Sequence, residues 1–195
     1  MPKLGMEPIR RAALVEATIH EIGAQGSLDV TVGAIAKRAG MSSALAHHYF
    51  GGKEQIFLAA MRHTLTVYGA EVRGALAMAK TPQERVEAIV RASFSNSNFR
   101  PDVIAAWLNF YVLAQTVPDA TRLLKIYQAR LRSNLVFALR PLIGERAGEL
   151  ASNIAALIDG VYLRQSLVKA VPDQSGAARQ VLDYLDLELE RACDE

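Results

Sequence analysis

The sequence predicts an all-α protein of about nine helices, with an N-terminal three-helix helix-turn-helix domain and a larger C-terminal helical domain. Apolar residues recur at helical spacing, and almost no stretch alternates apolar and polar residues as a strand would. Prolines and glycines separate these periodic segments at lengths that suit helices. An apolar share of 51% with 22% charged residues is typical of a globular protein with a core, and excludes the disordered class.

The first three helices follow from caps and apolar spacing. The first is expected over about residues 8–24, because a proline suits its first turn and Gly26 stands just beyond its end. Thr31 is a good N-cap for the second, whose apolar residues recur at i, i+3, i+4 and i+7. Gly40 ends it, since glycine adopts the left-handed turn conformation without steric cost, and Ser42 caps a short third helix. This spacing is that of a helix-turn-helix motif.

Six further helices are expected along the rest of the chain. A capping box with proline at the first helical position, Thr81-Pro82-Gln83-Glu84, begins the fifth helix. Arg140-Pro141 is expected to stop the seventh, because proline lacks the backbone donor that a helix interior needs. The fourth to ninth helices are placed at about residues 53–79, from 82 onward, from 101 to a point before Pro118, 118–139, 145–169 and 175–191.

The third helix carries side chains that hydrogen-bond and no negative charge. Ser43, His47 and His48 are left on one side of it, because the apolar Leu45 and Tyr49 lie four apart on the other. A short, weakly apolar helix without acids fits the DNA major groove, about 12 Å wide, if its neighbours hold it there. The pattern alone also fits a solvated helix in an ordinary helical bundle.

Composition narrows the classes of function. The formal net charge of +2 indicates that any contact with nucleic acid is local and made by a few placed residues. The single cysteine, Cys193, allows no intrachain disulfide, which suits a reducing compartment. No uncharged apolar run approaches the roughly 18 residues of a membrane span. We therefore expect a soluble, cytoplasmic protein without membrane contact.

Neither catalysis nor metal binding is expected. The chain lacks a Gly-rich phosphate loop, a nucleophile elbow and a pair of histidines at helical metal-binding spacing. His47 and His48 are adjacent, so on a helix they point about 100° apart and do not easily share one ion. We predict a protein that is no enzyme and has neither a cofactor nor a metal site.

The expected sixth helix places three aromatic rings on one face, because Trp107, Phe110 and Tyr111 are spaced i, i+3 and i+4. Such a stripe is commonly part of a core. The faces of such rings also attract cations, by roughly 0.5 to 2 kcal/mol each. Tyr162 could supply another ring and Asp159 a counter-charge. The alternative partners of Asp159, in a structural salt bridge, are Arg130 and Arg164.

The N-terminal part of the chain carries a set of motif elements in register. They are Arg10-Arg11, Leu14-Val15-Glu16-Ala17, Gly26, Thr31-Val32, Ile35-Ala36, Ala39-Gly40, His48-Tyr49-Phe50 and Lys53-Glu54. In this set the chain resembles the TetR family of bacterial repressors. The resemblance implies a DNA-binding domain at residues 1–55, with its motif at about 31–50, and a domain for effector binding and dimerisation at 56–195. Because this boundary falls inside the expected fourth helix, we expect movement in one domain to be felt in the other.

The resemblance implies that double-stranded operator DNA is the partner of the motif. The serines and histidines of the third helix can donate to phosphate or to guanine N7 and O6, and Tyr49 and Lys53 match family positions that meet the DNA backbone. The predicted DNA-binding residues are Thr31, Lys37, Arg38, Ser42, Ser43, Ala44, His47, His48, Tyr49 and Lys53. Small side chains at Ala44 and Ala46 leave few direct base contacts, so DNA shape is expected to carry part of the specificity.

Segments outside the motif narrow the resemblance. They are the first six residues, Ala106-Trp107-Leu108, Ser133-Asn134-Leu135-Val136, residues 156–160 and Leu163-Arg164. They resemble the choline-responsive repressors of glycine betaine synthesis, which implies control of choline uptake and conversion and a small cationic effector, choline or betaine aldehyde. The predicted effector-binding residues are Trp107, Phe110, Tyr111, Asp159 and Tyr162. The better-known pattern has tryptophan where Tyr111 and Tyr162 stand, although tyrosine also serves in aromatic cages.

The eighth expected helix is apolar almost all round, and the ninth has a matching apolar stripe. A helix without a polar face must be covered on every side. Both helices could lie in the core of one protomer, or they could form a four-helix interface in a two-fold homodimer, which the TetR resemblance also implies. The predicted interface residues are Leu157, Val161, Val168, Val181 and Leu185. Such a dimer demands a near-palindromic operator.

Two other functions fit the same sequence. A TetR-type regulator of another pathway, such as multidrug efflux, would also bind cations in an aromatic pocket. A helical protein-interaction module would use the apolar eighth and ninth helices, and it would form no sequence-selective complex with DNA.

Overall fold

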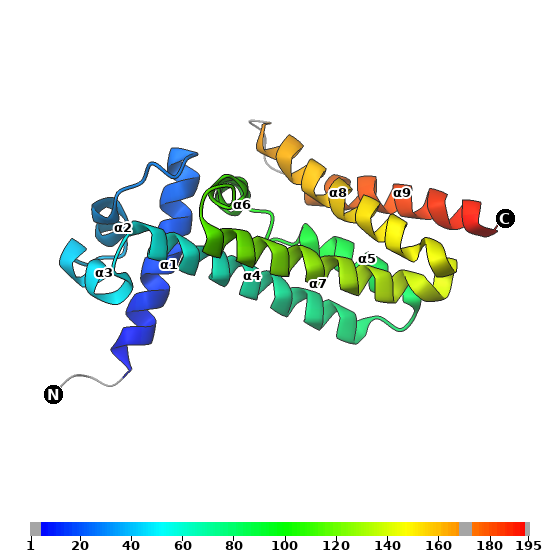
Figure 1. Cartoon of the computed structure of the whole chain (residues 1–195), viewed down its shortest axis with the longest axis horizontal. Helices are drawn as coiled ribbons and strands as arrows, with labels where there is room; N and C mark the ends of the chain where they lie inside the picture. Colours follow the sequence, from blue (N-terminus) through cyan, green and yellow to red (C-terminus); the bar gives the residue numbers. More distant parts are fainter. Residues whose placement is uncertain (1–4, 168–172, 194–195) are drawn as a thin grey trace. The chain divides into compact units, whose positions relative to one another are not determined.

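The computed structural model of the protein describes residues 5–167 and 173–193 (Figure 1). The regular structure of these residues consists of nine α-helices and one short 3-10 helix, which confirms the all-α prediction. In chain order the elements are α1 (Met6–Gln25), α2 (Val32–Arg38), α3 (Ser43–Phe50), α4 (Lys53–Met78), α5 (Pro82–Ser93), α6 (Pro101–Leu113), α7 (Pro118–Ile143), η1 (Gly144–Arg146), α8 (Ala147–Ser166) and α9 (Gln174–Cys193).

The helices form two compact units. Unit 1 combines Met1–Thr64 with Pro101–Leu123, and unit 2 combines Leu65–Arg100 with Leu124–Glu195. Helices α4 and α7 therefore contribute residues to both units, and α6 belongs to the same unit as the helix-turn-helix. The predicted boundary after residue 55 separates a DNA-binding domain from a domain for effector binding and dimerisation. It stays a prediction, and it does not coincide with the division into compact units.

Unit 1 is built around α1, which packs against α2 and α6, while α2 packs against α3. Leu14 and Ile22 of α1, Ile35 of α2 and Ile56 of α4 are fully buried and form its core. α1 ends at Gly26, whose φ of 67° lies in the left-handed region and whose amide donates to the Ile22 carbonyl at 2.8 Å. This is the glycine stop that the sequence predicts.

The turn between α2 and α3 is held by its own backbone. Gly40 has a φ of 69°. Its amide donates to the Lys37 carbonyl at 3.1 Å, and the Met41 amide donates to the Ala36 carbonyl at 2.8 Å. These two bonds form a Schellman motif, which satisfies carbonyls that the end of a helix otherwise leaves unpaired. The turn therefore sets the direction in which α3 leaves α2.

Unit 2 is a helical bundle in which α9 packs against both α5 and α8. The predicted capping box begins α5: the Glu84 amide donates to Thr81 Oγ1 at 3.1 Å, and the Glu84 carboxylate accepts from the Thr81 amide at 3.2 Å. Apolar side chains from four helices are fully buried between them. The innermost include Val86, Ile89, Leu135, Leu139, Ile154, Val181 and Leu185.

Two predicted helix boundaries are wrong. α7 continues past Leu139 to Ile143 and includes Pro141, which was expected to stop it. A proline this close to a helix end forfeits a single backbone bond, so the last turn still forms. α8 begins at Ala147 and is preceded by the 3-10 turn η1, whereas the prediction placed its start at Glu145. Its predicted end at residue 169 lies outside the described residues.

Tyr68 of α4 is a buried polar residue of unit 2, with 8% of its surface exposed. Its ring meets that of Tyr127 edge-on at 5.5 Å. Its hydroxyl lies 3.2 Å from Ser93 Oγ, and either oxygen can be the donor, while Ser93 Oγ also lies 3.0 Å from the Ile89 carbonyl oxygen. Burial raises the pKa of Tyr68 to about 12, helped by the negative charge of Asp159 and opposed by the hydrogen bond to Ser93.

We predict that this residue makes the protein less stable in alkali. An unfolded tyrosine loses its proton near pH 10, whereas folded Tyr68 keeps it until about pH 12. Between these values the unfolded state binds fewer protons, so the free energy of unfolding falls as pH rises, by up to about 1.4 kcal/mol per pH unit. Urea denaturation at several pH values should show a steeper loss for the wild type than for Tyr68→Phe. Equal slopes would contradict the prediction.

Candidate functional site

One face of α3 presents the predicted DNA-reading side chains. Ser43, Ala44, His47 and His48 occupy positions i, i+1, i+4 and i+5 and are all exposed, whereas Ala46 on the opposite face is fully buried. Residues 31–50 contain no aspartate or glutamate. This face can therefore approach phosphates and base edges without charge repulsion.

Two predicted contact residues also serve as helix caps. Thr31 Oγ1 accepts a hydrogen bond from the Ala34 amide at 3.1 Å, and Ser42 Oγ accepts one from the Leu45 amide at 3.2 Å. Each hydroxyl uses only its oxygen in the cap, so its proton remains available to a DNA phosphate. Both residues are exposed. One side chain can thus both start the helix and contact the ligand.

His47 is oriented by the end of its own helix. Its Nδ1 lies 3.1 Å from the carbonyl oxygen of Gly51, the residue that ends α3 with a φ of 77°. A carbonyl only accepts, so Nδ1 carries the proton. The neutral ring then has an acceptor at Nε2. In this form Nε2 can accept from the amino groups of cytosine or adenine. The sequence-based expectation, donation to guanine N7 or O6 or to phosphate, stays a prediction.

The cations around α3 differ in how far they are engaged. Lys37 is exposed. Arg38 donates from Nε to the Glu21 carboxylate, so DNA would have to compete with that carboxylate for its charge. The Lys53 ammonium lies 5.5 Å from the centre of the Phe57 ring, at the start of α4. Some cations near α3 are thus exposed, and others already contact a carboxylate or a ring, which is consistent with the small net charge of +2.

Two arginines of α1 also contact α3, the expected recognition helix, and the predicted set of DNA-binding residues omitted them. The Arg11 guanidinium lies over the rings of Tyr49 and Phe50, at 5.5 and 5.1 Å. Arg10 Nη1 is 3.4 Å from the Tyr49 hydroxyl oxygen, which accepts and keeps its own proton for a phosphate. The signal in the sequence was the Arg10-Arg11 pair, but only the structure shows that these side chains reach Tyr49 and Phe50.

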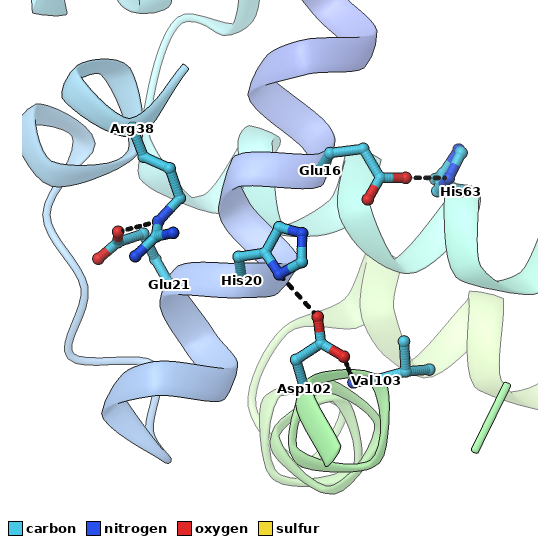
Figure 2. A network of polar contacts seen from close by, with 7 residues as sticks. All are labelled: Glu16, His20, Glu21, Arg38, His63, Asp102 and Val103. Atoms are coloured by element: carbon cyan, nitrogen blue, oxygen red, sulfur yellow. Dashed lines mark hydrogen bonds and ion pairs between the residues drawn. The ribbon is translucent and has the colours of Figure 1, made fainter. Parts of the chain in front are cut away.

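A close approach joins α1 to α6 (Figure 2). His20 Nδ1 donates to Asp102 Oδ2 at 2.7 Å, and Asp102 Oδ1 accepts from the Val103 amide at 3.0 Å. A Cβ atom at Gly23 would lie 2.4 Å from the Cβ of Asp102 and 2.6 Å from its Cα, far inside contact distance. Only glycine lets the two helices come this close.

Further polar contacts fix α1 within unit 1. Glu21 of α1 pairs with Arg38 of α2, and Glu16 Oε1 lies 3.0 Å from His63 Nε2 of α4 (Figure 2). Near the end of α1, Asn109 of α6 reaches the Gly26 carbonyl at 3.4 Å. α1 is thus tied to α2, α4 and α6 at separate points along its length.

The predicted effector residues of α6 divide into a pair and a core residue. The rings of Trp107 and Tyr111 lie 6.1 Å apart and tilted by 35°, as the i, i+4 spacing predicts. Phe110 is fully buried, and Trp107 is 6% exposed. Trp107 and Tyr111 therefore pair, and Phe110 packs in the core of unit 1.

The other two predicted effector residues, Asp159 and Tyr162, lie in α8 of unit 2. Tyr162 stacks on Phe94 at 5.7 Å and meets Phe99 edge-on at 5.2 Å. Its hydroxyl donates towards two backbone carbonyls, at 2.5 Å to Ser93 and 2.9 Å to Asn98. The sequence interpretation missed Phe94 and Phe99, which complete this aromatic cluster from the segment between α5 and α6. Asp159 lies close enough to Tyr68 for its charge to affect that hydroxyl.

The predicted dimer residues have different environments. Val181 and Leu185 are fully buried and Val161 is 6% exposed within a single protomer, because α9 packs against α5 and α8. These three side chains therefore serve the protomer core, the alternative that the sequence left open. Leu157 is 37% exposed and can still reach another copy. Val168 lies outside the described residues.

The described part of the chain has neither a membrane-spanning helix nor a cluster of metal-binding side chains. None of its helices is long and apolar enough to cross a membrane. Nor do three or more His, Cys, Asp or Glu side chains of these residues gather where they could hold a metal ion.

The fold and the acid-free face of α3 define a helix-turn-helix regulator that binds DNA. Residues 14–60 match the family of bacterial regulatory proteins named after tetR, and residues 82–190 match the BetI-type transcriptional repressor C-terminal family. The chain therefore belongs to the TetR family and, within it, to the BetI-type transcriptional repressors. Members of this family are transcriptional regulators and not enzymes, as the sequence predicted.

Relatives of known name match almost the whole chain. The HTH-type transcriptional regulator BetI of Brucella suis is 52% identical over 190 residues, covering 97% of this chain and 96% of the relative. That of Agrobacterium fabrum is 48% identical, covering 97% and 92%. A regulator structure from Pseudomonas aeruginosa PAO1 is 26% identical with a TM-score of 0.76, covering 96% and 93%. A regulator from Saccharomonospora viridis, solved with choline, has the same fold at 22% identity, with a TM-score of 0.80 and coverage of 90% and 95%.

We predict that Gly23→Ala destabilises unit 1 although alanine favours helices. The new methyl group would force α1 and α6 apart at Asp102, and overpacking of this kind costs about 1 to 3 kcal/mol. Gly74→Ala is a matched control, because nothing lies within 4 Å of a Cβ there. That change should raise stability by about 0.5 to 1 kcal/mol. Thermal unfolding of both variants would test this, and a Gly23→Ala protein as stable as the control would refute it.

Proposed function

We propose that the protein is a homodimeric repressor that binds a near-palindromic operator. It controls choline uptake and the conversion of choline to the osmoprotectant glycine betaine, and choline or a related cation such as betaine aldehyde relieves the repression. The 52% identity with a BetI regulator over 97% of the chain supports this most strongly. The matched span includes the C-terminal half, so the proposal covers sensing as well as DNA binding. The protein acts in the cytoplasm, where it meets the chromosome.

DNA recognition is proposed to combine contacts with the phosphates and a few contacts between α3 and the bases. Thr31, Ser42 and Tyr49 each keep a hydroxyl proton for phosphate, and Lys53 adds charge at the start of α4. His47 is the proposed base reader, with Nε2 accepting from an amino group of cytosine or adenine because Nδ1 faces the Gly51 carbonyl. The small Ala44 leaves room for the DNA to be read partly by its shape.

The effector is proposed to be held by aromatic rings, since a trimethylammonium group offers no hydrogen-bond donor and ring faces attract its charge. The proposed residues form two groups, Trp107 and Tyr111 in α6, and Tyr162 with Asp159 in α8. The relative from Saccharomonospora viridis binds choline, which supports the same class of ligand here. Asp159 is proposed as the counter-charge.

Coupling is proposed to pass from α6 to α1. Trp107 and Tyr111 lie on α6, and α6 meets α1 at Gly23 without room for a side chain, so a shift of α6 would move α1. α1 in turn contacts Tyr49 and Phe50 of the recognition helix through Arg11. Complete switching requires about 5.5 kcal/mol of differential binding, and typical coupling is about 1 to 3 kcal/mol. We therefore expect partial relief of repression.

Dimerisation is proposed to use exposed leucines of α8 and α9 together with Leu167, which directly follows α8. Leu157, Leu163, Leu167 and Leu187 are 37%, 51%, 76% and 59% exposed. Large apolar side chains gathered on the surface commonly mark an interface between proteins. A two-fold axis through this surface would pair two copies of α8 and α9 and present two recognition helices.

Binding to the DNA upstream of the chain's own gene should fall steeply with salt, because phosphate contacts release counterions. Lys53→Gln should weaken binding to all sequences and reduce the slope of log affinity against log salt by about 1 per protomer. Lys125→Gln is the control, since Lys125 is exposed in unit 2. Gel shifts at several salt concentrations would measure both.

An affinity that barely changes with salt, or equal slopes of log affinity against log salt for the two variants, would contradict the proposed phosphate contacts. No sequence-selective complex at all would instead favour a protein-interaction module.

Choline should bind at least tenfold more tightly than 3,3-dimethylbutan-1-ol, which has its shape without the charge, a difference of about 1.4 kcal/mol. Calorimetry and Trp107 fluorescence would measure the binding. Tyr111→Phe keeps the ring and should bind as the wild type does, whereas Tyr111→Leu should bind several times more weakly. Asp159→Asn tests the counter-charge in unit 2.

A weaker affinity for choline in Tyr111→Leu would place the cation against the rings of α6, and a weaker affinity in Asp159→Asn would place it near α8. Equal affinity for choline and its neutral analogue, or no heat and no fluorescence change with choline, would count against a cationic effector of this kind.

A further inference from the structure

Unit 2 contains a pocket of about 840 Å³ that is distinct from the predicted effector residues. It is lined by the segment that joins α4 to α5, by the first turn of α5 and by the last turns of α7. None of the five predicted effector residues lines it. Its size is in the range of small-molecule sites, about 300 to 1,000 Å³.

Four basic side chains line this pocket: Lys80, Arg85, Arg132 and Arg140. The lining contains no aspartate or glutamate. Among the described residues, none of the four takes part in an ion pair, whereas Arg11, Arg38 and Arg146 each pair with a glutamate. The adjacent Glu84 is already engaged, because its carboxylate accepts from the backbone amides of Lys80 at 2.6 Å and Thr81 at 3.2 Å. In a chain with a net charge of +2, this is a local concentration of positive charge.

Arg85 is the best placed of the four to bind a ligand. It is half-buried, and its Nε is fully buried without a hydrogen-bond partner among the described residues. A buried donor without an acceptor is costly, so an acceptor that enters the pocket would be favoured. The Arg85 guanidinium lies over the ring of Phe137, 5.3 Å from its centre, which fixes its orientation.

The pocket also offers apolar contact. Phe137 is 69% exposed, an unusual position for a phenylalanine, and Val136, Ala129 and Pro141 lie beside it in the lining. Four cations next to an exposed aromatic ring match a molecule with an anionic group at one end and an apolar body at the other.

We propose that this pocket binds a small organic anion, a carboxylate or phosphate group carried on an aromatic or aliphatic body. The anionic group lies between Arg85 and Arg140, and the apolar body lies against Phe137. The chain would then have a site for an anion in addition to its proposed site for a cation. This proposal rests on the pocket alone and stands independently of the choline effector.

Calorimetry with the full chain and three probes tests the chemistry. We expect 1-naphthyl phosphate to bind at least about tenfold more tightly than either 1-naphthol or inorganic phosphate, because it alone combines both features. Added salt should weaken its binding. Equal binding of 1-naphthol, or no binding of 1-naphthyl phosphate at about 1 mM, would overturn the proposal.

Two kinds of variant locate the binding. The double change Arg85→Gln with Arg140→Gln should weaken 1-naphthyl phosphate at least about tenfold, while the exposed Arg179→Gln elsewhere in unit 2 should change it less than about twofold. Ser133→Trp keeps all four charges but fills the pocket from an exposed position, so it should also abolish binding. Circular dichroism would check that each variant is folded. Unchanged affinity in folded Arg85→Gln/Arg140→Gln and Ser133→Trp proteins would refute the site.

Discussion

The close approach of α1 and α6 at Gly23 is the constraint on which the arrangement of unit 1 depends. Interiors of proteins are close-packed, so a contact of backbone against backbone leaves neither helix free to shift alone. Asp102 strengthens it by meeting His20 from the first turn of α6. The helix with the Trp107 and Tyr111 pair and the helix whose arginines contact α3 are therefore parts of one packed unit, although more than seventy residues separate them in the sequence.

Several polar side chains around α3 both stabilise the ends of helices and are predicted to contact DNA. The hydroxyl oxygens of Thr31 and Ser42 cap their helices, and the ring of His47 closes the end of α3 on the Gly51 carbonyl. These bonds orient the side chains before any DNA arrives, so less conformational entropy remains to be lost on binding. Arg38 is the exception, because it already pairs with the Glu21 carboxylate, and a phosphate would have to replace that partner.

Local chemistry predicted most of the helices, and contacts between distant residues account for most of what it missed. The capping box at Thr81 and the glycine stop at Gly26 depend on neighbouring residues and could be read directly. The burial of Val181 and Leu185 depends on α5, almost a hundred residues earlier, so the sequence left protomer core and dimer interface as alternatives. The close contact at Gly23 could not be predicted, because in the sequence a glycine within a helix indicates only a local loss of helix stability. The direction of His47 depends on a ring rotation that spacing does not specify, and its contact with DNA stays a prediction.

Residues 31–50 carry few fixed charges, which limits how tightly this segment can bind DNA of any sequence. Non-specific affinity for DNA comes from phosphate neutralisation, and this segment holds only Lys37 and Arg38, the latter already paired. This segment by itself therefore adds little to binding at the millions of wrong sites that a genome offers, and the charge proposed above for phosphate contact, that of Lys53, lies just outside it. Under the proposed function, the fewer molecules are held at wrong sites, the fewer are needed to occupy the operator, and a modest change in affinity there changes its occupancy directly.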